Sequence, residues 1–163
     1  MALPQYIKVS QGLARPEQHV GEIDPQQLPR LRLELAAPSQ ALQVTLGLAR
    51  DRGGNWLRGE LHGSLELECS RCEKVFAWPL DANIDLRLVR NDAEAQQVLE
   101  EADPYQVEDD RLVVADVVED EVLLALPMLP RCQQCEQAKA DAPEPAPAAK
   151  AERPNPFAQL KKS

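Results

Sequence analysis

Leu67-Glu68-Cys69-Ser70-Arg71-Cys72-Glu73 places two thiols three positions apart at the end of a predicted β-strand. Within Trp56–Glu68, apolar or small residues at the odd positions from Leu57 alternate with polar residues at the even positions from Arg58. Such alternation is typical of a sheet that buries one face and exposes the other. The segment Val75–Arg90 alternates again. The cysteine pair is therefore predicted to form the turn between two long antiparallel strands.

Further strands are predicted before this hairpin. Leu31–Ala36 and Leu42–Leu48 both alternate with period two, and Pro38 separates them. Asp51–Asn55 contains two glycines, which favour a tight hairpin turn. Nearer the N-terminus, short strands are predicted at Pro4–Val9 and Val20–Asp24, with a turn or short helix at Pro25–Leu28.

Helices are predicted after the long strands. Residues 91–101 should form a short helix capped by Asp92, and residues 102–110 an acidic loop. Arg111–Val114 is a short apolar link. The clearest helix spans 115–126: its core-facing residues would be Val118, Val122, Leu123 and Leu126, with Glu119, Asp120 and Glu121 pointing outward. The chain is thus predicted to be α+β, an antiparallel β-meander with one packed C-terminal helix.

The last part of the chain changes in composition. Residues 137–153 are rich in Ala, Pro and Glu and show no periodicity, which predicts a disordered linker. We therefore expect an ordered domain over 1–136 and a disordered tail over 137–163. The tail ends in a segment typical of short docking motifs, in which the partner-docking candidates are Asn155, Pro156, Phe157 and Leu160.

All four cysteines of the chain fall in two Cys-x-x-Cys pairs, the second being Cys132 and Cys135. Two such pairs can supply the four thiolates of a tetrahedral structural Zn²⁺ site. The usual spacing between pairs is roughly 15–20 residues, whereas 59 residues separate Cys72 from Cys132. The fold must therefore return the second pair to the first. The candidate metal ligands are Cys69, Cys72, Cys132 and Cys135, holding one structural Zn²⁺.

Two other interpretations of the thiols stay open at this point. Reduced cysteines are often buried simply as small apolar residues. Alternatively, the pairs could oxidise under stress and make the chain a redox-responsive protein, although such thiols usually begin a helix that follows a strand. A strand is predicted after Cys72 instead.

Charge is concentrated in one segment. Of the net charge of −9, residues 91–121 carry −11 and the remainder +2. Direct RNA binding normally needs a basic face. The candidates for such a face, should the fold gather them, are Arg30, Arg32, Arg50, Arg52, Arg58, Arg71, Lys74, Arg87 and Arg90.

Several classes of protein are not indicated by the sequence. No stretch of about 18 apolar residues predicts a transmembrane helix, and the first residues lack the pattern of a signal peptide. A cytoplasmic location is expected. Ser/His/Asp sets, phosphate-binding loops and HExxH motifs are absent, and His19 and His62 are isolated. No catalytic residues and no small-molecule substrate are predicted.

Four motifs together resemble a known family. They are Gly21-Glu22-Ile23-Asp24 followed by Leu28-Pro29-Arg30-Leu31; Leu67-Glu68-Cys69-Ser70-Arg71-Cys72; Val118-Glu119-Asp120-Glu121-Val122-Leu123-Leu124-Ala125-Leu126-Pro127; and Asn155-Pro156-Phe157-Ala158. As a set they are similar to those of the YceD family, the bacterial large ribosomal RNA subunit accumulation proteins.

The resemblance implies a role in the synthesis, processing or stability of 23S ribosomal RNA, without catalytic residues. The implied partners are a pre-50S particle, a ribosomal protein or 23S rRNA itself. The leading hypothesis is thus a non-enzymatic ribosome-biogenesis factor, and the alternative is a cytoplasmic thiol-redox-responsive protein.

Overall fold

The computed structural model describes residues 3–51 and 53–140 and divides the chain into two units, the second beginning at Gln133. Thirteen elements are described in this part of the chain. The strands are β1 Tyr6–Lys8, β2 Gln18–Ile23, β3 Leu42–Asp51, β4 Gly54–Glu68, β5 Val75–Val89, β6 Asp103–Gln106 and β7 Arg111–Val113. The helices are α1 Val9–Ala14, η1 Pro25–Gln27, α2 Leu31–Glu34, α3 Asp92–Val98, α4 Val114–Ala125 and α5 Gln133–Ala140.

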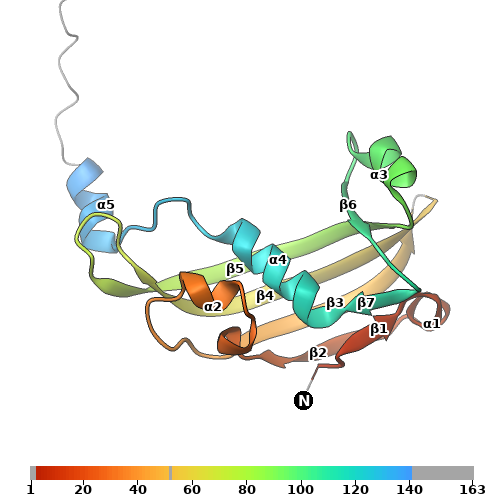
Figure 1. Ribbon diagram of the computed structural model, residues 1–163, viewed down its shortest axis with the longest axis horizontal. Coiled ribbons are helices and arrows are strands. Elements are labelled where there is room, and N and C mark those ends of the chain that lie inside the picture. The colour runs from red at the N-terminus through yellow and green to blue at the C-terminus, as the bar shows by residue number, and fades with distance from the viewer. Residues whose placement is uncertain (1–2, 52, 141–163) are drawn as a thin grey trace, which may run out of the picture. The chain divides into compact units, whose positions relative to one another are not determined.

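The first unit is built on a five-stranded sheet in the order β2-β3-β4-β5-β6 (Figure 1). The first four strands pair antiparallel, as the alternation predicts. Strand β1 pairs with β7 in a separate two-stranded sheet. The predicted α+β class and antiparallel meander are confirmed. None of the described helices is both long and apolar enough to cross a lipid bilayer.

The core lies on one face of the sheet. The leucine side chains at odd positions of β4 are buried, whereas polar side chains at even positions, such as Arg58, Glu60 and His62, are exposed. Helix α4 lies across the buried face (Figure 1) and contributes four buried residues to the core, Val114, Val117, Val118 and Val122. Their spacing of three, four and eight positions is the apolar stripe of a helix that packs on a sheet.

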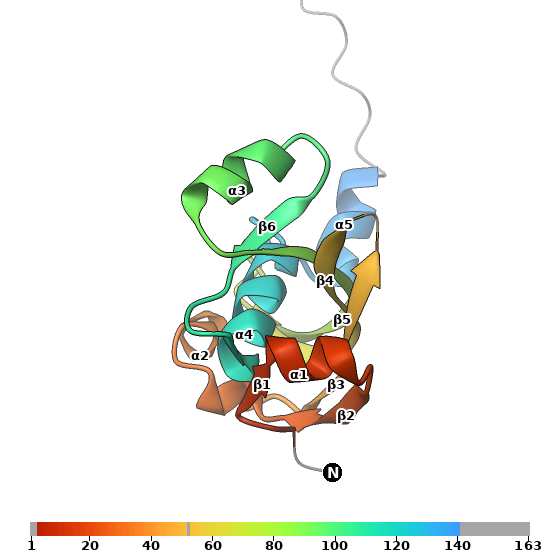
Figure 2. The ribbon, with the colours of Figure 1, turned by 90° about the vertical axis from the view of Figure 1, so that its right-hand side faces the viewer.

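Along the direction of its strands, the sheet has the β3–β4 hairpin at one end and the β4–β5 turn at the other. Gly53 has φ of +74° in the hairpin, a conformation that glycine adopts without a steric penalty. Figure 2 shows α1 at the hairpin end, near β1, β2 and β3. The β4–β5 turn is the segment that carries Cys69 and Cys72.

Three local expectations about secondary structure and capping were wrong. Residues 31–34 form the helix α2 instead of a strand, so Leu31 is buried while Leu33 is 78% exposed. The acidic segment predicted as a loop contains β6, which pairs parallel to β5 after the α3 connection. The cap of α3 is Asn91 rather than Asp92, because the Asn91 side chain accepts the Glu94 N–H at 2.9 Å.

The described part of the second unit is α5. It extends to Ala140, four residues beyond Glu136, where the ordered domain was expected to end. The four predicted docking residues, Asn155, Pro156, Phe157 and Leu160, lie outside the described residues.

Candidate metal centre

The β4–β5 turn holds Cys69 in a fully buried position. The Cys69 N–H donates to the carbonyl of Lys74 at 2.9 Å, and the Glu73 N–H donates to the carbonyl of Cys69 at 2.9 Å. Glu73 has φ of +58°, in the left-handed region. These two hydrogen bonds and the left-handed residue fold the turn back on itself, so that Cys69 and Cys72 face a common point.

A second segment of the first unit is joined to this turn. The backbone N–H and the hydroxyl of Ser70 both donate to the carbonyl of Pro130, at 2.8 and 2.9 Å. The Cys132 N–H donates to the sulfur of Cys69 at 3.4 Å. Across 59 residues of sequence, the fold thus returns the beginning of the second cysteine pair to the first pair.

Three sulfur atoms gather at this point. The sulfurs of Cys69, Cys72 and Cys132 lie within 4.8 Å of one another, and those of Cys72 and Cys132 are 3.6 Å apart. Tetrahedral Zn–S bonds of ~2.3 Å place two sulfurs about 3.8 Å apart. A disulfide would need ~2.05 Å, and none of the three residues forms one. The spacing is too long for a disulfide and is compatible with three ligands of one metal ion.

The environment of Cys69 favours the thiolate form. The hydrogen bond from the Cys132 N–H lowers the pKa of Cys69, burial opposes this by raising it, and further hydrogen bonds from Cys72 and Arg71 lower it again, to about 6. The thiolate is the form that binds metal ions. Cys135, the fourth predicted ligand, lies in the first turn of α5 in the second unit, three residues after Cys132.

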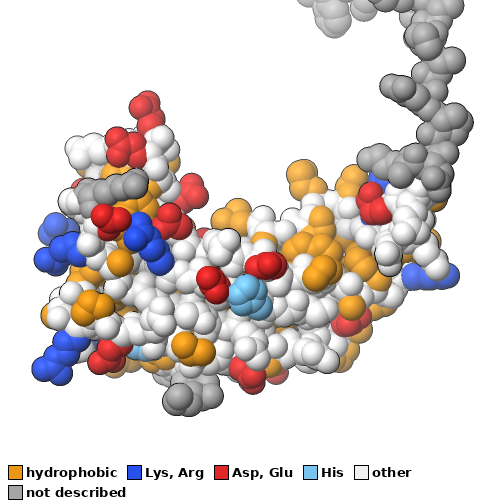
Figure 3. Space-filling model, turned by 180° about the vertical axis from the view of Figure 1, so that it is seen from behind, with side chains coloured by type: hydrophobic (Ala, Val, Ile, Leu, Met, Phe, Trp, Pro, Cys, Tyr) orange, Lys and Arg blue, Asp and Glu red, His pale blue; other side chains and the backbone are white. Residues whose placement is uncertain are grey.

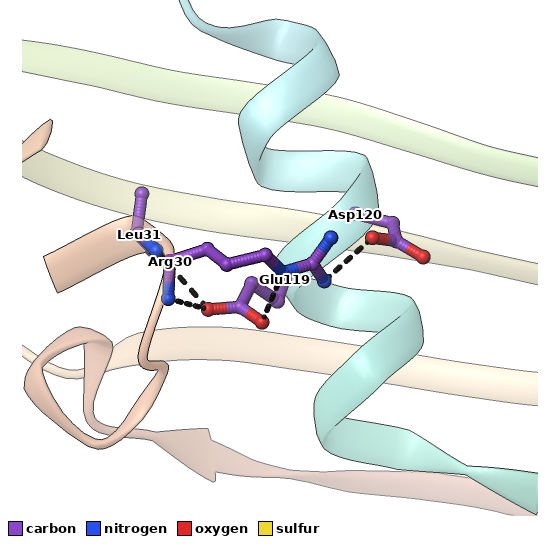
Figure 4. A network of polar contacts seen from close by, with 4 residues as sticks. All are labelled: Arg30, Leu31, Glu119 and Asp120. Carbon is purple, nitrogen blue, oxygen red and sulfur yellow. Dashed lines mark hydrogen bonds and ion pairs between the residues drawn. The ribbon is translucent and has the colours of Figure 1, made fainter. Parts of the chain in front are cut away.

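A buried carboxylate holds α4, the helix that leads towards Cys132. Glu119 is only 3% exposed, although outward exposure was predicted for it. One of its oxygens accepts the backbone N–H groups of Arg30 and Leu31 at 2.6 and 3.0 Å, and the other accepts Arg30 Nε at 2.9 Å (Figure 4). The Arg30 guanidinium also reaches Asp120 at 2.6 Å. Burial raises the pKa of Glu119, but these hydrogen bonds outweigh it and lower the pKa below the ordinary value.

This interaction explains why α2 is a helix. The first N–H groups of a helix have no partner within it, and a carboxylate there is favourable. Glu119 satisfies these donors from 88 residues away. The only signal in the sequence for a buried Glu119 was its position beside the apolar stripe of α4. That signal was weak, because solvated acidic residues are far more common than buried ones.

The predicted basic residues are only partly gathered. Arg50, Arg87 and Arg90 line one open cavity of about 480 Å³ at the β3–β4 hairpin end. Arg58 pairs instead with Asp51 and Asp85, at 3.3 and 2.9 Å. Of the remaining candidates, Arg30 and Arg32 lie in or beside α2, and Arg71 and Lys74 lie in the β4–β5 turn. Arg52 falls outside the described residues.

The fold and the cysteines define an α+β protein whose mostly antiparallel sheet ends in a cluster of thiols that could hold a metal ion. Comparison with known proteins agrees with the resemblance noted in the sequence. Residues 57–162 match the family described as "Large ribosomal RNA subunit accumulation protein YceD". The chain belongs to the YceD family.

A curated relative matches nearly the whole chain. The large ribosomal RNA subunit accumulation protein YceD of Haemophilus influenzae is 28% identical over 164 residues, covering 97% of this chain and 94% of the relative. No solved structure matches the chain. These names concern ribosomal RNA and give no support to the redox interpretation of the thiols.

Proposed function

We propose that the protein is a cytoplasmic, non-enzymatic factor of ribosome biogenesis that supports the synthesis, processing or stability of 23S ribosomal RNA. The observation that carries the proposal is family membership over residues 57–162, together with a relative of the same name along nearly the full chain. Its partner would be a pre-50S particle, a ribosomal protein or 23S rRNA. In this function the ordered domain offers a binding surface rather than a reaction centre.

The proposed cofactor is one structural Zn²⁺. Cys69, Cys72 and Cys132 would supply three thiolates, and the support for this is that their sulfurs lie within 4.8 Å of one another. Cys135 would supply the fourth, because a Cys-x-x-Cys pair can turn both sulfurs to one ion. With four thiolates and no open position, such an ion stabilises the fold and activates no water. It would fasten the β4–β5 turn to the segment that follows α4.

The proposed domain organisation assigns binding to both parts of the chain. Residues 1–136 would form the ordered domain, and residues 137–163 a linker that ends in a docking segment. In that segment Asn155, Pro156, Phe157 and Leu160 would contact a protein partner.

The function is tested by deleting the gene in its own host and measuring 23S against 16S rRNA. We expect a lower ratio of 23S to 16S rRNA in the deletion strain and its restoration by the full-length chain. Normal ratios in the deletion strain, under growth conditions that express the protein, would contradict the proposal. The control for the load of expression is an unrelated protein of similar size, expressed from the same promoter in the deletion strain.

A further inference from the structure

A basic cavity lies at the end of the sheet opposite the cysteines. It has a volume of about 480 Å³ and is lined by α1, the β3–β4 hairpin, the end of β5 and the loops around α3. Its cationic residues are Arg50, Arg87 and Arg90. Figure 3 shows Lys and Arg side chains at this end of the molecule, with Asp and Glu side chains beside them. Cavities of this size accommodate ligands of the size of a nucleotide.

The cavity also contains two carboxylates, those of Asp110 and Glu94. Asp110 accepts the backbone N–H and the hydroxyl of Ser10, at 2.9 and 2.5 Å. Glu94 accepts the backbone N–H of Arg90 at 2.9 Å and lies 3.6 Å from its Nε. Among the described residues, no ion pair involves Arg50 or Arg87. Arg50 and Arg87 thus have no ion-pair partner in the described part of the chain, and the cavity carries three guanidinium groups against two carboxylates, a net charge of +1.

Arg87 is held in a defined position. Its guanidinium lies against Gly54, where a Cβ would come within 1.0 Å of Nη1, so only glycine leaves room for it. It donates to the carbonyl of Gly53 at 3.3 Å and lies 5.5 Å from the centroid of the Trp56 ring. A hollow of about 90 Å³ adjoins this point and is lined by Trp56 and Arg87 together with Val98, Glu101 and Ala102. A fixed cation thus stands beside an aromatic ring.

This combination favours one kind of ligand. Guanidinium groups bind phosphate and carboxylate alike through paired N–H donors, so the aromatic ring rather than the charge distinguishes nucleic acid from an acidic peptide here. Single-stranded nucleic acid also stacks its bases on aromatic rings and arginine planes. A duplex presents many regularly spaced phosphates and therefore needs a wide basic surface. The basic surface here is small, because carboxylates pair with both Arg58 and Arg90.

We propose that this cavity binds single-stranded RNA, with Arg50 and Arg87 contacting phosphates and the exposed part of the Trp56 and Arg87 stack contacting a base. The inference rests on the proposed function, to which it adds a direct RNA contact and its location. It also separates the two ends of the sheet: the thiol cluster stabilises one end, and RNA binds at the other.

The first test measures binding of a fluorescent single-stranded oligouridylate by anisotropy at low ionic strength. The double variant Arg50→Glu/Arg87→Glu should bind at least ~10-fold more weakly than the natural chain. Losing two phosphate contacts should also flatten the slope of log K against log salt by about 1.4. The matched control Arg15→Glu/Arg32→Glu makes the same change in net charge at exposed positions outside the cavity and should retain most of the affinity.

A second variant removes the geometry without changing the charge. Gly54→Ala puts a methyl group where the Arg87 guanidinium lies, and the flexible side chain must move away. Binding should weaken while net charge and thermal stability stay close to those of the natural chain. In a Trp78→Phe background, adding the oligouridylate should quench the remaining Trp56 fluorescence.

Three results would each overturn the inference: no RNA binding by the natural chain, equal losses in the cavity variant and its control, or equal competition by poly-glutamate. None of these results bears on the proposed function, which the rRNA ratio of the deletion strain decides. Conversely, normal rRNA in that strain would refute the proposed function while leaving the measured RNA affinity intact.

Discussion

At the scale of single residues, the side chain of Glu119 joins α4 to the start of α2. Its carboxylate accepts three hydrogen bonds from Arg30 and Leu31 while only 3% of the residue is exposed. Removing the acceptor charge leaves buried N–H groups with a weaker partner, and unsatisfied buried donors cost about 1–3 kcal/mol. The nearby Asp120 also contacts Arg30, but its side chain is 40% exposed, where ion pairs contribute little.

We therefore expect Glu119→Gln to lower the free energy of unfolding by about 1–3 kcal/mol at neutral pH, since a neutral amide oxygen is a weaker acceptor. Asp120→Asn is the matched control and should cost less than ~1 kcal/mol. Urea denaturation monitored by circular dichroism measures both. A Glu119→Gln midpoint equal to that of the natural chain would show that the carboxylate charge does not support α2.

The same interaction has a defined pH dependence. The native pKa of Glu119 lies below its ordinary value of 4.5, so the unfolded state binds more protons as the pH falls. The stability that Glu119 contributes is fully present above about 4.5 and is lost as the pH falls through the native pKa. Burial and the charges of Asp103 and Asp120 raise the pKa of Glu121, which acts in the opposite direction. The difference in the free energy of unfolding between the natural chain and Glu119→Gln, measured against pH, isolates the contribution of Glu119. A difference that persists at low pH would contradict this pH dependence.

At the scale of elements, the β4–β5 turn is where zinc should act. Purified protein should contain one zinc per chain, and either double variant, Cys69→Ser/Cys72→Ser or Cys132→Ser/Cys135→Ser, should lose it. Ser70→Ala is the control, because Ser70 lies within the same turn and hydrogen-bonds Pro130 but offers no thiolate. Atomic emission spectrometry of protein kept reduced throughout measures the metal.

Removing the metal should also destabilise the fold. Saturating a site at 100 times its Kd contributes about 2.7 kcal/mol, which for a domain of this size corresponds to roughly 5–10 °C in Tm. A chelator should lower the Tm of the natural chain by that amount and leave the Tm of both cysteine variants unchanged. Protein that contains no zinc, or a Tm that the chelator does not alter, would contradict a structural metal site and would leave Cys69 and Cys132 as buried apolar residues.

At the scale of the whole molecule, what could be predicted follows the range of the interactions. Strands β3, β4 and β5 and helix α4 came from residue periodicity, which is a local property. Helix α2 was missed because a carboxylate distant in sequence caps it, and tertiary contacts override local pattern. Strand β6 is four residues long and acidic, and its pairing depends on the free edge of β5. The cysteine spacing indicated four candidate ligands, and the hydrogen bonds from Ser70 to Pro130 and from Cys132 to Cys69 show how the fold brings the two segments together.

The last prediction concerns the end of the chain, which lies outside the described residues. The family match extends to residue 162 and so includes this segment. If Phe157 and Leu160 are apolar anchors for a partner, Phe157→Ala/Leu160→Ala should reduce 23S rRNA accumulation towards the level of the deletion strain, because few anchors carry most of the energy of such contacts. The control Lys161→Ala/Lys162→Ala changes the adjacent residues and should restore rRNA more fully. Both variants should unfold at the same temperature as the natural chain, since terminal segments contribute little to the stability of a folded domain. Full rRNA accumulation by the anchor variant would refute the docking role and would confine partner binding to the ordered domain.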